Sequence, residues 1–453
     1  MRNTAIALVL ASLLAAAQPA FSARAGGPAQ PAGPRPPNIV IIFADDLGYG
    51  DLSVYGHPTI RTPRLDRLAA EGLKLTSFYA AEPVCSASRY SLLAGRYSAR
   101  AGITGALMPD SKDGLAAGET TIADLLKSAG YRTGIVGKWH LGHRPGFFPT
   151  EHGFDSYFGL PYSNDMIRPW VQTDVPLRFY RGTQALPGEV DNATLTERYT
   201  SEALAFIRES KGRPFFLYLA HSMPHVPLGV PPAFAGKSAG GRYGDVIEML
   251  DWSTGCVLDE LRAQGLERNT LVIFTSDNGP WMEMPARMFA DERIVPTDAG
   301  SAGPLRGSKS MSWEGGVRVP FLARWPGRIP AGSVSSELAA TLDILPTVAG
   351  IAGASIPAGR VIDGRDILAL LEGRGPSPDE WFFYFRSGSS RPEGVRDRRW
   401  KLHLTFPDTG EPTVALYDLA LDPAERFDVA AGHADIVARL SARLRQFAAE
   451  IAK

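Results

Sequence analysis

Residues 37–46, PNIVIIFADD, decide the fold class of this chain. The apolar run is short and rich in β-branched residues, a composition typical of a strand that is buried on both faces. Such a strand belongs to a sheet that carries helices on both sides. The run leads directly into Asp45 and Asp46, so the first predicted strand ends on a pair of carboxylates.

Predicted strands and helices alternate through the middle of the chain. Helices are indicated by caps and helical apolar spacing at residues 62–72, 120–130, 197–210 and 244–265. Further buried strands are predicted at residues 131–139, 213–221 and 269–276. This alternation predicts an α/β domain with a largely parallel or mixed sheet and helices on both faces.

The sequence pattern changes near Trp381, where short predicted strands separated by turns begin. A helix with an apolar face follows at residues 435–452, which predicts a small antiparallel sheet with one packed helix. We therefore expect two folded domains, at residues 38–380 and 381–453.

The N-terminal residues have the pattern of a secretory signal peptide. Arg2 precedes an apolar run at residues 5–17, and small residues follow. The run is shorter than the roughly 20 residues that a membrane span needs. We expect a signal peptide at residues 1–25, a flexible leader at residues 26–37, a secreted or periplasmic protein, and no stable membrane insertion. The net charge of −1, with no basic cluster, argues against a nucleic-acid partner.

Polar side chains follow each of the four predicted strands of the larger domain. In chain order they are Asp45 and Asp46, Lys138 and His140, His221 and His225, and Asp277 and Asn278. Ligands of open α/β sheets bind outside the carboxyl ends of the strands, so these groups should share one rim. Each of these groups alone is weak evidence of function, and their coincidence is what indicates a site.

The chemistry of this rim indicates a divalent cation and an oxyanion. Four of its members offer oxygen ligands, which suit Ca²⁺ or Mg²⁺ better than zinc: Asp45, Asp46, Asp277 and Asn278. Arg89, Lys138 and Lys309, together with two imidazoles, could grip an oxyanion. A divalent ion beside a basic cluster predicts a site for sulfate or phosphate esters.

The chain has two cysteines, Cys85 and Cys256. Cys256 lies in an apolar helical pattern and is interpreted as a packed residue. Cys85 lies at the start of a predicted helix, where the backbone favours an anion. It could be a nucleophile, a redox thiol or a buried structural residue, and a disulfide with Cys256 stays open on sequence alone. A thiolate is a poor match for a hard, oxygen-ligated ion.

Several segments, in order, resemble those of the type I sulfatases, close to the arylsulfatase A and N-acetylgalactosamine-6-sulfatase branch. The similarity extends from about Pro37 to the C-terminal helix, and its segments are FADDLGYGDLSVYGHP, CSASRYSLLAGR, GIVGKWHLGHRPGFFPTEHGFD, PYSND, FTSDNGP, GPLRGSKSMSWEGGVRVP and LYDLALDPAER. The resemblance implies an alkaline-phosphatase-like fold, with a large mixed sheet flanked by helices and a smaller C-terminal antiparallel sheet with one packed helix.

The resemblance also implies that Cys85 is converted to Cα-formylglycine, whose hydrate is the nucleophile. Such a residue is not locked in a disulfide, and its oxygen is a hard ligand. Ca²⁺, or Mg²⁺, would be held by Asp45, Asp46, Cys85, Asp277 and Asn278.

The other roles follow from the same resemblance. Arg89 and Lys138 would hold the hydrated aldehyde, and His140 would take a proton from it. Lys309 and His225 would bind sulfate and assist the leaving group. Ser163 in PYSND would touch sulfate, with Lys138 as a further sulfate contact. Asp165 and His221 are secondary candidates, and His221 is interpreted as structural.

The segment departs from the commoner Cys-x-Pro-x-Arg pattern, because Ala87 stands at the third place. A formylglycine-generating maturation enzyme is the expected protein partner, and Ala87 leaves its identity open. The expected substrate is a sulfate ester, as a small aryl sulfate or a sulfated saccharide.

Two other functions remain open at this point. One is a phosphodiesterase or phosphonate monoester hydrolase of the same superfamily. The other is a catalytically inactive, sulfatase-like binding protein, against which the complete set of site residues argues. The two-zinc phosphatases match less well, because they place a histidine where this chain has Asn278.

Overall fold

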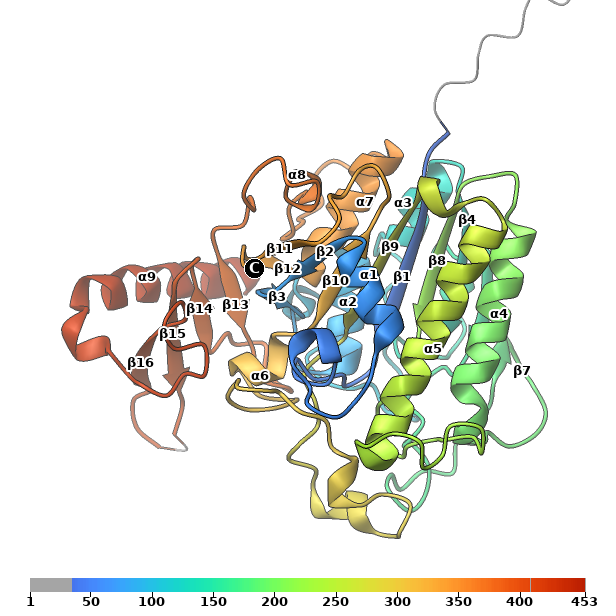
Figure 1. Cartoon of the computed structure of the whole chain (residues 1–453). Coiled ribbons are helices and arrows are strands. Elements are labelled where there is room, and N and C mark those ends of the chain that lie inside the picture. Colours follow the sequence, from blue (N-terminus) through green and yellow to red (C-terminus); the bar gives the residue numbers. More distant parts are fainter. Residues whose placement is uncertain (1–34, 408, 453) are drawn as a thin grey trace, which may run out of the picture. The chain divides into compact units, whose positions relative to one another are not determined.

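A mixed sheet of ten strands forms the centre of the computed structural model (Figure 1). The structure describes residues 35–407 and 409–452, so the predicted signal peptide and most of the predicted leader lie outside the described residues. The strands are β1 (Asn38–Ala44), β2 (Leu73–Leu75), β3 (Phe78–Tyr79), β4 (Arg132–Gly137), β5 (Ser156–Gly159), β6 (Tyr180–Arg181), β7 (Gln184–Ala185), β8 (Phe215–Ala220), β9 (Thr270–Ser276), β10 (Phe321–Arg324), β11 (Ser333–Ser335), β12 (Ala339–Ala340), β13 (Phe382–Tyr384), β14 (Gly394–Arg396), β15 (Trp400–Thr405) and β16 (Thr413–Asp418). The α-helices are α1 (Pro63–Ala70), α2 (Cys85–Ala94), α3 (Ile122–Ser128), α4 (Leu195–Glu209), α5 (Gly241–Ala263), α6 (Glu314–Val317), α7 (Ile344–Ala352), α8 (Leu368–Leu371) and α9 (Ala434–Ile451).

The sheet has the strand order β11-β2-β10-β9-β1-β8-β4-β5-β6-β7. The central strands β9, β1, β8, β4 and β5 run parallel to one another, whereas β10 is antiparallel to both β9 and β2. The carboxyl ends of the central strands therefore meet at one edge, as the sequence predicts.

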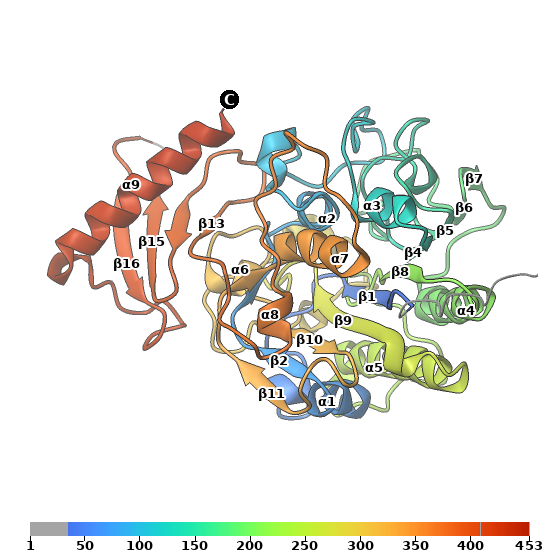
Figure 2. The ribbon, with the colours of Figure 1, turned by 90° about the horizontal axis from the view of Figure 1, so that it is seen from above.

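Helices cover both faces of this sheet because the strand side chains alternate in direction. Ile39, Ile41 and Phe43 of β1 pack in a core with residues of α2, α3 and α7. Val40 and Ile42 pack in a second core with residues of α1, α4 and α5. Figure 2 shows the two layers of helices on opposite sides of the strands. Every residue of β1 is buried, which explains its apolar, non-alternating sequence.

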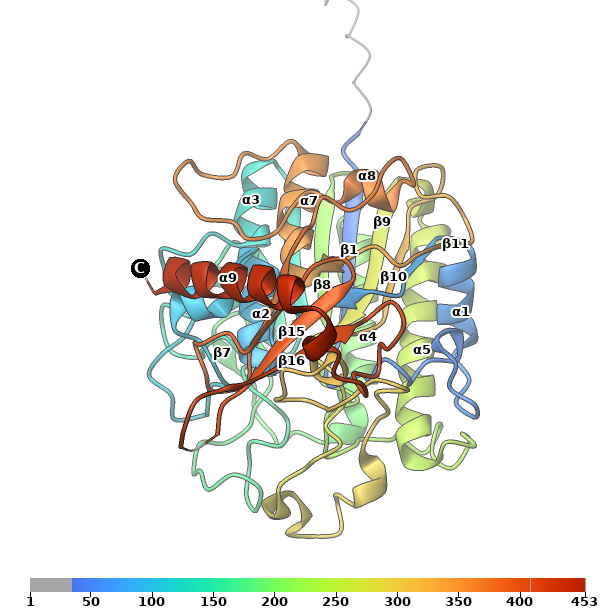
Figure 3. The ribbon, with the colours of Figure 1, turned by 90° about the vertical axis from the view of Figure 1, so that its left-hand side faces the viewer.

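The C-terminal strands β13, β14, β15 and β16 form a separate antiparallel sheet. Helix α9 packs across it through Leu440, Leu444 and Phe447 (Figure 3). The predicted fold class is thus confirmed. The chain from Pro36 onward forms one compact unit, and a domain boundary between residues 380 and 381 stays a prediction.

None of the helices in the described part of the chain has the length and apolar character that crossing a membrane requires.

Gly137, the last residue of β4, is required by the packing just before Lys138. Its φ is +115°, and a Cβ there would lie 1.8 Å from the Ala220 carbonyl oxygen. We predict that Gly137→Ala lowers the free energy of unfolding by about 2 kcal/mol or more, because backbone strain adds to overpacking. Thermal and urea unfolding measure the change.

Gly118→Ala is the matched control, since a Cβ at Gly118 would meet no atom within 4 Å. A Gly137→Ala protein as stable as the Gly118→Ala protein would contradict this account of the strand end.

Candidate active site

The residues predicted for the site lie together at the carboxyl edge of the sheet, and all are buried. They are Asp45, Asp46, Cys85, Arg89, Lys138, His140, Ser163, His225, Asp277, Asn278 and Lys309. β1, β4, β8 and β9 or the loops after them deliver most of this set, while α2 supplies Cys85 and Arg89. These side chains converge because the parallel strands that carry most of them end at the same edge of the sheet.

One half of the cluster joins two carboxylates to two cations. Lys138 Nζ donates to Asp45 Oδ2 at 2.5 Å. Arg89 Nη2 donates to Asp277 Oδ2 at 2.8 Å and lies 3.4 Å from Asp45 Oδ2. Burial alone would raise the pKa of Asp45, but Lys138 and Arg89 outweigh it and lower that pKa. Burial and the neighbouring charge of Asp45 raise the pKa of Asp277 to about 7.

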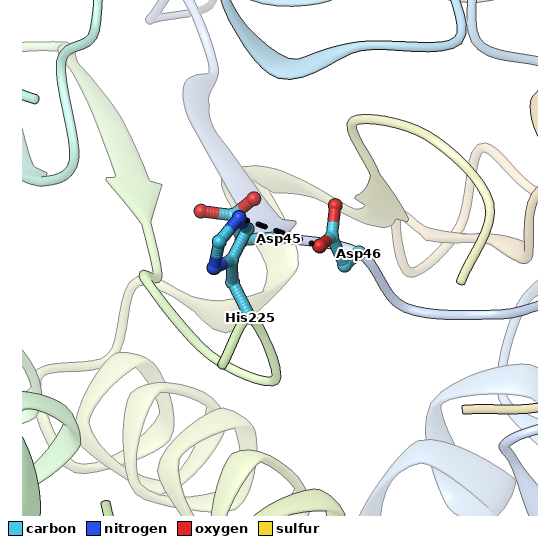
Figure 4. Close-up of side chains that lie close together, drawn as sticks. All are labelled: Asp45, Asp46 and His225. Carbon is cyan, nitrogen blue, oxygen red and sulfur yellow. Dashed lines mark ion pairs between the residues drawn. The ribbon is translucent and has the colours of Figure 1, made fainter. Parts of the chain in front are cut away.

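Asp46 is the centre of the other half of the cluster. Its Oδ2 accepts from Lys309 Nζ at 2.8 Å, and its Oδ1 accepts from Asn278 Nδ2 at 2.7 Å. His225 Nε2 lies 3.5 Å from Asp46 Oδ2 (Figure 4). The Asp46 N–H donates to Asp277 Oδ1 at 3.0 Å, which connects the two halves. Asp46 has φ +65°, an uncommon backbone for a non-glycine residue that turns its side chain off the strand end.

The donor set fits a hard divalent cation. Asp45, Asp46 and His225 each offer a ligand atom, and these atoms lie within 4.8 Å of one another. Asp45 Oδ1 and Asn278 Oδ1 are buried and have no hydrogen-bond partner among the described residues. Buried polar atoms normally have partners, so two orphaned oxygens beside like-charged carboxylates indicate a place for a cation. His225 joins this group in the structure, although the sequence assigns it to sulfate.

Cys85 begins α2 and is 2% exposed. Burial raises the pKa of its thiol, and Lys138 and Lys309 only partly oppose that effect. An unmodified Cys85 is therefore a protonated, weak nucleophile at neutral pH. Both cysteines are free thiols, since no disulfide joins Cys85 to Cys256.

His140 has one ring nitrogen fixed and the other open. Its Nε2 lies 2.9 Å from the Leu107 carbonyl oxygen, so Nε2 carries the proton and donates it. Its Nδ1 is buried and has no hydrogen-bond partner among the residues that the structure describes. Burial, helped by Lys138 and Arg89, lowers the pKa of His140 well below its usual value. The ring is thus neutral, with an unshared electron pair on Nδ1 available to accept a proton.

A cavity of about 170 Å³ opens over these groups. Five of the predicted residues line it: Cys85, His140, Ser163, His225 and Lys309. Ser163 Oγ also accepts from Lys138 Nζ at 3.1 Å. His221 is not among the lining residues, and its Nε2 lies 3.4 Å from Ser253 Oγ.

Two other lining residues have no recognisable signal in the sequence. Met108 comes from the loop whose Leu107 carbonyl holds His140, and Ser387 comes from the chain just after β13. Trp281 also lines the cavity; it belongs to the segment WMEMPARMF, which the sequence offers as an aromatic and Met-rich surface for an apolar or sugar leaving group.

Comparison with known proteins identifies the class. The Sulfatase family model matches residues 37–354, and the model for the C-terminal part of N-sulphoglucosamine sulphohydrolase matches residues 308–450. The chain belongs to the sulfatase family.

Its relatives include well-characterised members of that family. N-acetylgalactosamine-6-sulfatase of Rattus norvegicus is 42% identical over 82% of this chain and 72% of the relative. Arylsulfatase A of Homo sapiens is 38% identical over 91% of this chain and 87% of the relative. The chain is accordingly a sulfuric ester hydrolase, an enzyme that cleaves sulfate esters.

Solved structures agree with this class. A sulfatase studied in glycosaminoglycan metabolism by Bacteroides thetaiotaomicron has a TM-score of 0.79 at 30% identity, over 92% of this chain and all of that one. A sulfatase from Pseudoalteromonas sp. has a TM-score of 0.80 at 28% identity, over 92% of this chain and 90% of that one. The phosphonate monoester hydrolase of Agrobacterium radiobacter, over 92% of this chain and 96% of that one, shares the fold at 22% identity and a TM-score of 0.63.

Arg89 should carry a large share of the stability of the metal-free site. Arg89→Met keeps most of the side-chain volume but leaves Asp45 and Asp277 without their buried guanidinium. We predict a loss of about 3–5 kcal/mol in the free energy of unfolding, measured with urea in the presence of chelator.

Arg64→Met provides the comparison, since Arg64 pairs with Asp259 at 3.3 Å and both side chains are 46% exposed. That variant should lose no more than about 1 kcal/mol. Equal losses in the two variants would contradict the role given to the buried guanidinium.

Glu82 gives the protein a predictable pH dependence. It is 2% exposed and accepts from Ser98 Oγ at 3.0 Å, and burial raises its pKa to about 8. The folded state therefore binds more protons than the unfolded state between the ordinary glutamate pKa and 8, so stability falls as the pH rises. Glu82→Gln mimics the neutral form and should remove that fall.

Relative to the parent, Glu82→Gln should gain roughly 3–5 kcal/mol in unfolding free energy between pH 5 and pH 9. Urea unfolding across this range measures the gain, and Glu283→Gln, at an exposed position, is the control. A parent–variant difference that stays constant with pH would refute the assignment.

Proposed function

We propose that this enzyme hydrolyses sulfate monoesters to an alcohol or phenol and inorganic sulfate, with a Cα-formylglycine formed from Cys85 and a bound Ca²⁺ or Mg²⁺. The observation that carries the proposal is the cavity in which Cys85, His140, His225 and Lys309 face one small volume. The relatives that act on sulfated sugars by name support a sulfated saccharide as substrate, and an aryl sulfate is the simpler alternative.

The cation would be held by Asp45, Asp46, Asp277, Asn278 and the oxygen of residue 85. When bound, it supplies a Lewis acid for a sulfate oxygen. The orphaned oxygens of Asp45 and Asn278 support this ligand set. Lys138 and Lys309, which pair with Asp45 and Asp46, would then be free to turn to sulfate oxygens.

Formylglycine at position 85 would supply, through its hydrate, the oxygen nucleophile that a buried thiol cannot supply. The free state of Cys85 supports the conversion, because a disulfide would block it. Arg89 and Lys138 would lower the energy of negative charge next to residue 85. A formylglycine-generating enzyme would be the maturation partner, with Ala87 in the recognised segment.

His140 would act as the proton acceptor at Nδ1, since the Leu107 carbonyl holds its Nε2–H. His225, in its protonated form, would donate its Nε2–H to the ester, because its Nδ1–H already donates to the Val226 carbonyl oxygen at 2.6 Å. Lys309 would bind sulfate and support charge on the departing oxygen. Ser163, fixed by Lys138, would contact sulfate.

Export and domain division complete the proposal. A secretory signal in residues 1–25 would direct the protein out of the cytoplasm, to the periplasm or the medium. Residues 38–380 would form the catalytic domain, and residues 381–453 would form the smaller domain that contributes Ser387 to the cavity.

The state of residue 85 tests the proposal. In protein expressed with a maturation enzyme, mass spectrometry of the tryptic peptide 75–89 should show an aldehyde at position 85. The same protein should release sulfate from aryl or sugar sulfate esters, and Cys85→Ala should lower that rate by a factor of about 10³ or more, because the nucleophile is lost.

A side-by-side assay with phosphate diesters separates the alternative function, because a sulfate monoester and a phosphate diester carry the same single charge. Faster hydrolysis of the diester would contradict the assignment as a sulfatase. Full activity with an unmodified thiol at position 85 would contradict the formylglycine mechanism.

A further inference from the structure

The cavity over Cys85 contains one acidic side chain that none of the roles above uses. Asp165 lines the cavity together with Ser163, His225 and Lys309, and it is 5% exposed. Its Oδ1 is fully buried and has no hydrogen-bond partner within the described part of the chain. Across residues 35–407 and 409–452, no ion pair includes Asp165.

An unpartnered carboxylate oxygen is costly at such a place. Leaving a buried acceptor unsatisfied costs stability, and more so for a charged group. The cations of the site donate elsewhere: Arg89, Lys138 and Lys309 donate to the other carboxylates. Arg287, which also lines the cavity, donates to the Trp170 carbonyl at 2.9 Å. A fourth carboxylate, added to Asp45, Asp46 and Asp277, also repels a sulfate ester. A carboxylate that lowers stability and repels sulfate is therefore expected to form a favourable contact with another part of the bound substrate.

The backbone fixes Asp165 next to the sulfate end of the cavity. Ser163, two positions earlier, contacts Lys138, and the Met166 N–H donates to the Ser163 carbonyl at 3.1 Å, closing a turn. Asn164 Nδ2 donates to the Pro227 carbonyl at 3.2 Å, which fastens this turn to the loop of His225. These bonds hold the backbone on both sides of Asp165 beside the loop of His225.

Part of the remaining wall is apolar, while Arg287, Ser310 and Ser387 add polar groups to it. Met108, Met166, Val171 and Trp281 line the same cavity. The Trp281 ring lies 4.4 Å from Lys309 Nζ and 5.4 Å from the His225 ring, so it stands beside the sulfate-binding pair. An aromatic face next to an unpartnered carboxylate suits a ring that has an apolar face and a hydroxyl.

We propose that Asp165 is a specificity-determining residue, whose free carboxylate oxygen accepts a hydrogen bond from a hydroxyl group adjacent to the sulfate ester. The preferred substrate class is then a sulfated sugar with a free hydroxyl beside the ester, seated on Trp281. The small cavity requires the hydroxyl to be close to the ester. A water molecule can occupy the position until substrate displaces it. This inference rests on the proposed function and specifies its substrate.

A pair of simple esters tests the inference without needing the natural substrate. 2-Hydroxyphenyl sulfate and 2-methoxyphenyl sulfate both carry an ortho oxygen, but only the first can donate a hydrogen bond. Binding is measured by calorimetry in Cys85→Ala protein with Ca²⁺, which cannot turn the esters over. We expect the hydroxyl ester to bind at least about tenfold more tightly, as for a hydrogen bond to a charged acceptor.

Adding Asp165→Ala should reduce that preference to within about threefold, because the acceptor is lost. Adding Asp165→Asn keeps the shape of the side chain and should give an intermediate preference, which covers the case of a poorly folded alanine variant. Adding Asp174→Ala, whose side chain is 93% exposed and pairs with Arg168, should leave the preference unchanged.

Three results would overturn the inference. The first is no preference for the hydroxyl ester in the Cys85→Ala parent, including no binding of either ester. The second is a preference that survives both Asp165 changes. The third is an equal loss of binding for both esters, which would make Asp165 a positioning residue for His225.

Turnover of the same esters by the mature enzyme distinguishes a failure of the inference about Asp165 from a failure of the proposed function. Sulfate release with no effect of Asp165 on the hydroxyl-to-methoxy ratio of kcat/KM overturns only the inference. Absence of sulfate release from every ester tested overturns the proposed function, whatever the binding data show.

Discussion

The structure depends on the burial of three carboxylates, Asp45, Asp46 and Asp277, at one edge of a parallel sheet. Like charges in a dry site repel strongly, so the arrangement persists only because Arg89, Lys138 and Lys309 are buried with them. The formal charges of these six groups cancel. A site balanced in this way can accept a divalent cation together with an anionic substrate, since the two additions offset one another.

The second sheet supports this arrangement from outside. The loop that carries Lys309 continues into Ser312, whose carbonyl accepts from the buried Lys401 of β15 at 3.0 Å. Lys401 also pairs with Glu425 at 2.6 Å, and the Ser387 N–H donates to the Ser310 carbonyl at 3.1 Å. The C-terminal residues therefore position a cation of the site and also contribute a wall of the cavity. This coupling explains why the small sheet packs with the large one as a single compact unit.

Much of this could be predicted from the sequence, and the rest could not for physical reasons. Buried parallel strands have continuous apolar runs, so β1, β4, β8 and β9 and the polar residues after them were predictable. Short strands at or next to the sheet edges, such as β6, β7 and β11, have too few residues for a periodic pattern. The Nδ1 of His140 is open because the carbonyl of Leu107, distant in sequence, accepts from its Nε2. Asp165 Oδ1 is unpartnered because no donor of the described residues lies within hydrogen-bond distance of it. Such contacts, and such missing partners, are set by the folded structure and cannot be predicted from the sequence.

The most direct test of the central claim is a calorimetric titration of Ca²⁺ into chelator-treated protein. The account predicts one ion per chain, a rise in melting temperature on binding, and at least about a hundredfold weaker affinity in Asp45→Asn, since a charged ligand and an orphaned oxygen are replaced. Asp174→Asn, at a side chain that is 93% exposed, should bind as the parent does. Failure of the parent to bind Ca²⁺ or Mg²⁺, or undiminished affinity in Asp45→Asn, would contradict the account.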